Sequence, residues 1–142
     1  MRMDSDLAAW LKTIERCGLY RAPEQIMLQL SEAARTAGLK YYAVELTGCP
    51  DKRSVLAALA RDLQLPEWFG FNWDALEEVL ADLEPCVIVL HGLEDLGRKS
   101  PYDLALALDL FRSVVDEQRQ SGRSMWVFVG MQADPSIPAC SE

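Results

Sequence analysis

Apolar residues recur at helical spacing in five stretches of the chain. The first stretch follows Asp4 and Asp6 and ends at Gly18, and the second opens at Pro23 and ends at Gly38. Acidic residues and proline are typical of helix starts, and glycine is typical of the residue just past a helix end. The pattern therefore predicts two amphipathic helices in the N-terminal part of the chain.

The same spacing predicts three helices in the rest of the chain. One is capped by Asp51 and breaks at Pro66, where the ring removes a backbone donor. A short one begins after Asn72, whose side chain suits the N-cap position. A long one opens at Pro101 and ends at Gly122.

Three short apolar runs, at residues 41–46, 87–90 and 125–129, lie between helices and predict strands. The run at 87–90 has no polar alternation, which is typical of a strand buried on both faces. Strands that alternate with helices pair in parallel through right-handed crossovers. We therefore expect an α/β fold, a single domain with a three-stranded parallel sheet packed with helices. Residues 1–39 are expected to form an N-terminal helical extension, residues 40–130 the domain proper, and residues 131–142 a flexible tail.

Composition limits the classes of function. The 142 residues include 22 acidic and 14 basic ones, for a net charge of -8 at pH 7. This charge disfavours nucleic acid as a direct ligand, because phosphate binding requires lysine and arginine. It favours a basic partner or serves solubility alone. With no apolar run of membrane length, no signal-peptide pattern and no close cysteine pair, we expect a cytoplasmic protein without metal or cofactor.

The negative charge is concentrated in one segment. Between Arg61 and Arg98 there is no lysine or arginine, whereas the rest of the chain holds 13 acidic and 14 basic residues. The nine acidic residues of this segment are Asp62, Glu67, Asp74, Glu77, Glu78, Asp82, Glu84, Glu94 and Asp95. The whole negative excess therefore lies within it.

Part of this charge forms a stripe on the short helix after Asn72. Asp74, Glu78 and Asp82 fall at positions i, i+4 and i+8, opposite a face of leucine and valine. Like charges four residues apart destabilise a helix by roughly 0.2–0.5 kcal/mol per pair. The pattern favours a binding surface, and an ordinary solvated face is the alternative.

Four aromatic residues lie in the loop before this helix or at its start, namely Trp68, Phe69, Phe71 and Trp73. A short loop cannot bury all of them, so one or two are expected in the core and the others at the surface, where exposed tryptophan is typical of interface anchors. An acidic helix beside exposed aromatic rings fits a surface that fills a cationic cleft, with carboxylates in place of phosphate oxygens. The predicted partner-binding residues are Trp68, Phe69, Gly70, Phe71, Asn72, Trp73, Asp74, Glu77, Glu78 and Asp82.

The segment LPEWFGFNWDAL, from Leu65 to Leu76, resembles the signature of the barstar family of ribonuclease inhibitors, L-P-x-aromatic-aromatic-G-x-N-x-D-A-L. A weaker similarity extends over residues 41–129. The resemblance implies an antitoxin or immunity protein that occludes the active site of a basic, barnase-like ribonuclease toxin. Carried over position by position, it assigns contacts to Trp68, Phe69, Gly70, Asn72, Asp74 and Glu78.

The chain departs from barstar itself at functional positions. Barstar has tyrosine where Trp68 and Phe69 stand, aspartate where Glu78 stands, and a further acidic residue where Ser113 stands. A carboxylate that enters a pocket is sensitive to displacements of about 1 Å. These departures favour a related basic nuclease over barnase as the target.

Two other functions are open at this stage. A non-inhibitory binding module would dock another basic protein on the same acidic and aromatic face. An enzyme would use His91, which follows the predicted strand at 87–90, or the carboxylates of Asp74 and Glu78. No nucleophile pattern, P-loop or dinucleotide motif accompanies these residues, so we do not expect an enzyme.

Overall fold

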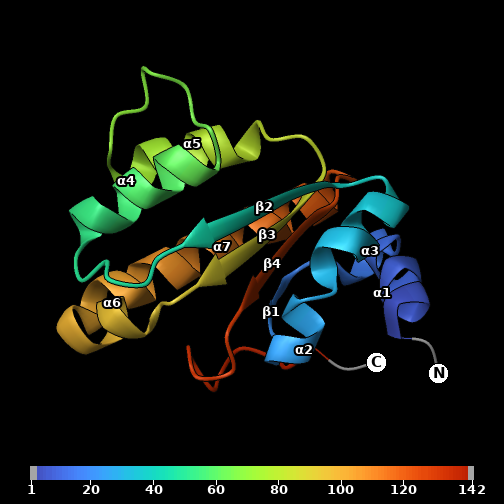
Figure 1. Ribbon diagram of the computed structural model, residues 1–142. Helices are drawn as coiled ribbons and strands as arrows, with labels where there is room; N and C mark the ends of the chain where they lie inside the picture. The colour runs from blue at the N-terminus through green and yellow to red at the C-terminus, as the bar shows by residue number, and fades with distance from the viewer. Residues whose placement is uncertain (1–2, 141–142) are drawn as a thin grey trace.

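A parallel four-stranded sheet forms the centre of the protein, in a computed structural model that describes residues 3–140 and the side chains of residues 6–140 (Figure 1). The strand order is β1-β4-β3-β2, and each neighbouring pair is parallel. The strands are β1 (Leu19–Arg21), β2 (Lys40–Glu45), β3 (Cys86–His91) and β4 (Met125–Val129). The predicted α/β class and parallel pairing are confirmed.

The expected number of three strands was wrong, because β1 adds a fourth at the edge beside β4. This strand has three residues, too few for alternation to be visible in the sequence. It directly follows a segment that the apolar spacing predicted as helix up to Gly18. That helix ends at Leu11, and Ile14, an apolar residue of the same predicted stretch, is 39% exposed. Residue Asp4, part of the predicted helix start, has a side chain outside the described ones.

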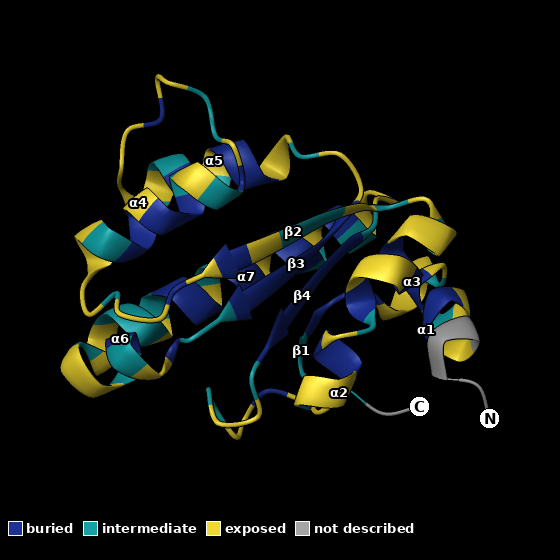
Figure 2. Ribbon diagram, viewed as in Figure 1, coloured by how far each residue is buried: buried dark blue, intermediate teal, exposed yellow. Residues whose placement is uncertain are grey.

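Helices cover both faces of the sheet (Figures 1 and 2). They are α1 (Met3–Leu11), the 3-10 turn η1 (Ile14–Arg16), α2 (Glu24–Met27), α3 (Leu30–Ala37), α4 (Lys52–Asp62), α5 (Trp73–Ala81), α6 (Glu94–Lys99) and α7 (Pro101–Gln120). One core joins α4, α5, α6 and α7 to one face of the sheet. A second core joins α1, α2 and α3 to Val87, Val89, Trp126 and Phe128 on the other face.

Most predicted helix limits are confirmed. The Asp51 side chain accepts from the Ser54 N–H at 2.9 Å and caps α4, and Gly38 ends α3 in the left-handed conformation. The helix predicted from Pro23 to Gly38 is divided into α2 and α3, with Leu28 exposed at the break. Helix α6 was not predicted. Its six residues carry acidic residues in the first turn and basic ones in the last, which is the available sequence signal.

The C-terminal segment, predicted to be a flexible tail, packs against β1 as far as residue 140. Ile137 is fully buried, and its carbonyl accepts from the Arg21 guanidinium at 2.7 Å. Arg21 also donates its backbone N–H to the Pro138 carbonyl at 2.8 Å. The segment is therefore held against β1 by the burial of Ile137, by the hydrogen bonds of Arg21 and by an isolated β-bridge between Arg21 and Ala139. No helix among the described residues has the length and apolar character needed to cross a membrane.

Gly92 lies directly after β3, where the carboxyl ends of β2 and β3 pack closely, and a substitution there tests this packing. Its φ is +82°, and a Cβ built there would lie 2.2 Å from Thr47 Oγ1 and 2.4 Å from Thr47 N. We expect Gly92→Ala to lower the free energy of unfolding by ~3 kcal/mol or more, because the clash is with backbone as well as side chain. Urea denaturation followed by circular dichroism measures this change.

Gly122→Ala is the matched control, since Gly122 has a φ of +76° but open space around its Cα. The left-handed conformation alone costs about 1 kcal/mol for alanine. Equal losses in the two variants would show that packing against Thr47 contributes nothing.

Candidate protein-binding site

Side-chain hydrogen bonds of Asn72 join helix α5 to the loop before it. The Asn72 side-chain oxygen accepts from the Ala75 N–H at 2.7 Å, which confirms the predicted N-cap, and its amide group donates to the Gly70 carbonyl at 3.3 Å. Leu76, Val79 and Leu80 anchor the inner side of the helix in the core. The outer side of α5 is therefore held in place without using any of its charged residues.

The outer side of α5 carries the acidic stripe predicted from the sequence. Asp74, Glu78 and Asp82 are exposed and Glu77 is half-buried. Among residues 6–140, none of the ion pairs found involves these four carboxylates. Their charge therefore has no paired cation among the side chains that the structure describes.

The arginines at the two limits of the acidic segment form ion pairs with carboxylates outside α5. Arg61 pairs with Asp62 at 2.8 Å, which lowers the pKa of Asp62, and Arg98 pairs with Asp95. The Gly48 N–H donates to the Asp95 carboxylate, and this hydrogen bond is the main cause of its lowered pKa. The compensated carboxylates are thus those outside α5.

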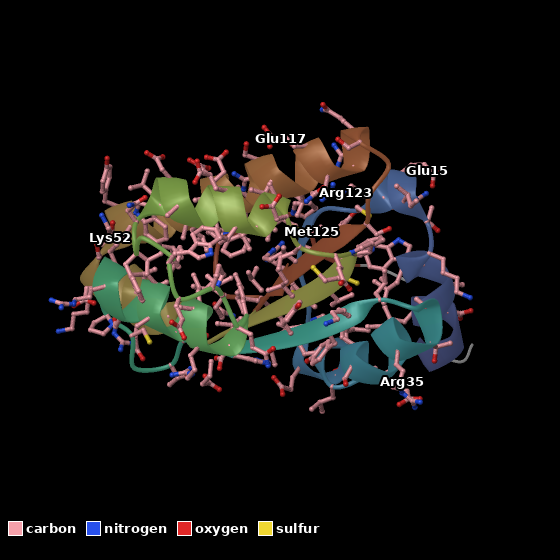
Figure 3. All side chains as sticks on the ribbon, turned by 90° about the horizontal axis from the view of Figure 1, so that it is seen from above. Glu15, Arg35, Lys52, Glu117, Arg123 and Met125 are labelled. Atoms are coloured by element: carbon pink, nitrogen blue, oxygen red, sulfur yellow. The ribbon has the colours of Figure 1, made fainter. Side chains whose placement is uncertain are left out.

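One arginine approaches the C-terminal end of α5 but binds its backbone. Arg123 donates to the Ala81 carbonyl at 2.8 Å, and Gln118 donates to the same oxygen at 2.9 Å. Figure 3 shows Arg123 and Lys52 at opposite ends of the layer that α4 and α5 form. Cations therefore flank this layer, while the stripe between them is acidic.

The aromatic residues divide into two exposed and two supporting rings. Trp68 is 72% exposed and Phe71 is 52% exposed, on a loop that stands out from α4 and α5 (Figures 1 and 2). Phe69 is buried and contacts the Phe71 ring with centroids 4.9 Å apart, and Trp73 packs half-buried on the core. The division matches the expectation that one or two of these rings belong to the core.

Phe71 adopts a backbone conformation that is unusual for a bulky residue. Its φ is +54°, in the left-handed region that favours glycine. An exposed phenylalanine held in this conformation is strained, and strained residues cluster at functional sites. The observation supports a role for the loop beyond packing.

Two hollows lie on either side of the loop. Trp68 borders a groove of about 210 Å³ between the end of α4 and the end of α5, lined also by Gln64, Leu65, Pro66, Val79, Asp82 and Leu83. Phe71 borders an open hollow of about 570 Å³ with Asp51, Lys52, Arg53 and Asp103. The first groove was not foreseen, because its apolar residues come from the loop after α4 and from the C-terminal end of α5, and the sequence does not reveal how these two segments are placed.

His91, which the enzyme alternative would use, lies at the end of β3 outside this site, whereas Asp74 and Glu78 belong to it. His91 ends β3 opposite Glu45 on β2, whose pKa is lowered mainly by hydrogen bonds from Thr47. Burial raises the pKa of the Cys86 thiol to about 12 and also raises that of Cys17. Within residues 6–140, no group of three or more histidine, cysteine, aspartate or glutamate side chains is placed to hold a metal ion.

The Asn72 cap yields a test of how the loop and α5 are held. We expect Asn72→Ala to lower the free energy of unfolding by about 1 kcal/mol, because the Ala75 N–H loses its acceptor. Asn72→Asp keeps an acceptor at the positive end of the helix and should remain within about 0.5 kcal/mol of the wild type. Urea denaturation compares them, and equal losses would contradict the capping role.

Comparison with known proteins gives one family and one fold. Residues 39–130 match the model of the family described as Barstar (barnase inhibitor). The structure of the Aeropyrum pernix ORC2 protein, solved as ADPNP-ADP complexes, superposes with a TM-score of 0.59 at 16% sequence identity, over 92% of this chain and 41% of that one. At this identity the likeness concerns the fold alone. No curated protein matches this chain in sequence.

Proposed function

We propose, because the chain belongs to the barstar family, that it inhibits a basic ribonuclease by occluding the active site with α5 and the aromatic loop. The family is described as an inhibitor of barnase, and this description names no catalytic activity. The observation that carries the proposal for this chain is the exposed stripe of Asp74, Glu78 and Asp82, which has no ion-pair partner among the described residues.

The charge of the stripe suits a ribonuclease active site. Such a site binds the phosphates of RNA with lysine and arginine, and carboxylates can accept the same charge-assisted hydrogen bonds. Carboxylates that repel one another destabilise the free helix, and attraction to a cationic partner would offset this repulsion in the complex. Binding would thus use a charge pattern that does not stabilise the free protein.

The rigidity of the site supports tight binding. Asn72 caps α5, and the inner face of the helix is packed in the core, so the backbone that carries the carboxylates needs little ordering on association. Trp68 offers a large exposed ring at the edge of the stripe, which is the usual form of an interface anchor. An inhibitor that protects the cell from such a toxin would act in the cytoplasm and would need neither cofactor nor catalytic group.

Mixing the protein with purified basic ribonuclease toxins of the barnase type tests the proposal. RNA cleavage, followed with a fluorogenic substrate, should disappear at an equimolar ratio for the cognate enzyme. Persistent cleavage at excess protein across this class would reject inhibition. A non-inhibitory docking module would show a complex by gel filtration while cleavage continues.

Glu78 is expected to dominate binding among the acidic residues. Glu78→Gln should weaken inhibition by at least about tenfold, because it leaves a buried cation of the nuclease unpaired. Glu94→Gln is the control, since Glu94 is equally acidic and exposed but lies on α6. The inhibition constants of the two variants test this prediction, and similar values would mean that another face of the protein binds the nuclease.

Association with the nuclease should be fast and should slow as salt is added. This expectation is taken from the behaviour of the barnase–barstar pair, in which opposite charges steer the encounter. Stopped-flow fluorescence at 0.05 and 0.5 M NaCl should give an association rate that falls by about tenfold or more, because the Debye length shortens. A rate independent of salt would argue against electrostatic steering by α5.

A further inference from the structure

We propose that the groove between Trp68 and Asp82 binds an arginine side chain of the partner protein. The groove holds about 210 Å³ and lies between the end of α4 and the end of α5. That the partner is a nuclease rests on the proposed function, whereas the chemistry of the groove does not. Leu65, Pro66 and Trp68 lie within the family signature and Asp82 within the predicted acidic stripe, but neither pattern indicates a groove between them.

The carboxylate of the groove stands where a cation is needed. Asp82 is the C-cap of α5, so its negative charge lies at the negative end of the helix dipole. It is exposed, and within residues 6–140 no ion pair reaches it. The Arg123 guanidinium donates to the Ala81 carbonyl and so compensates the end of the helix backbone, but none of the ion pairs found joins it to Asp82. A cation from a partner would give the Asp82 carboxylate the counter-charge that it lacks among the described side chains.

The rest of the lining favours arginine over other cations. Leu65, Pro66, Val79 and Leu83 provide apolar surface for the methylene stem of a long side chain. The Trp68 indole, 72% exposed, offers a flat face on which a planar guanidinium stacks. A lysine ammonium is more strongly hydrated and cannot stack in this way, so it should bind more weakly.

The charge of the groove excludes two other occupants. No basic residue lines it, so an acidic side chain would be repelled by Asp82. A purely apolar side chain would cover the Asp82 carboxylate without giving it a hydrogen bond, which is unfavourable. Arginine satisfies the carboxylate, the indole and the apolar floor together.

NMR titration of the whole protein, without any nuclease, tests the inference. Unlabelled N-acetyl-arginine amide, N-acetyl-lysine amide and N-acetyl-citrulline amide are added in turn to ¹⁵N-labelled protein. The arginine compound should shift the Trp68 indole resonance and the backbone resonances of Val79 and Asp82 in a saturable way. The lysine compound should bind more weakly, and the neutral citrulline compound should cause no saturable shift.

Two single-charge variants separate the groove from the net charge of the protein. Asp82→Asn should weaken binding of the arginine compound by about fivefold or more, because the charge-assisted hydrogen bond is lost. Glu84→Gln removes the same charge two residues away, outside the groove lining, and should stay within about twofold of the wild type. Both residues are exposed, and ¹⁵N spectra confirm folding of each variant.

Equal binding of arginine and citrulline compounds, or equal losses in the two variants, would overturn the inference. Inhibition of a nuclease by a protein whose groove does not bind arginine would reject the groove and leave the proposed function intact. Binding of arginine by a protein that inhibits no basic ribonuclease would reject the proposed function and support the groove.

Discussion

Two-sided burial of β3 and β4 is the constraint on which the rest of the structure depends. Every residue of β4, and every residue of β3 except His91, is buried, so both faces of the sheet require a layer of helices. Helices α1, α2 and α3 provide the second layer, and Trp10 meets the Trp126 ring with centroids 4.6 Å apart. These helices precede residue 39, where the family match begins. The N-terminal segment is therefore part of the core.

In this arrangement α5 packs on the core through its inner side, and its outer side is not needed for packing. Other helices of the protein carry i,i+3 ion pairs on their exposed sides: α3 has one, α6 has one and α7 has two. Helix α5 carries repeated carboxylates, and among the described side chains none of them has a basic partner. Exposed ion pairs contribute little to stability, so their absence is tolerated. What the contrast shows is that the charge pattern of α5 differs from that of its neighbours in the same fold.

The sequence predicted the parts of the fold that depend on local chemistry. The caps at Asp51 and Asn72, the buried strand at 87–90 and the exposed acidic stripe follow from spacing and residue type, and the structure has them. Strand β1 was missed because it pairs with the distant β4 and spans too few residues for periodicity. The break at Leu28 was missed because the apolar spacing continues across it. The sequence predicted that one or two of the rings in the aromatic loop are buried, but it did not predict which ones. That depends on how the loop packs against α4 and α5.

The same division between local and distant causes explains why the groove beside Trp68 could not be read from the sequence. Its walls come from residues 64–68, where the predicted helix breaks at Pro66, and from residues 79–83 at the end of the next helix, so no local pattern contains both. Their approach is set by Phe69, whose burial draws the loop onto the core while its neighbours stay exposed. The turn that follows, with Phe71 at positive φ and Asn72 capping α5, then fixes Trp68 next to Asp82 rather than elsewhere on the surface. A strained backbone and a helix cap, each a local feature, thus combine to build a site that neither specifies alone.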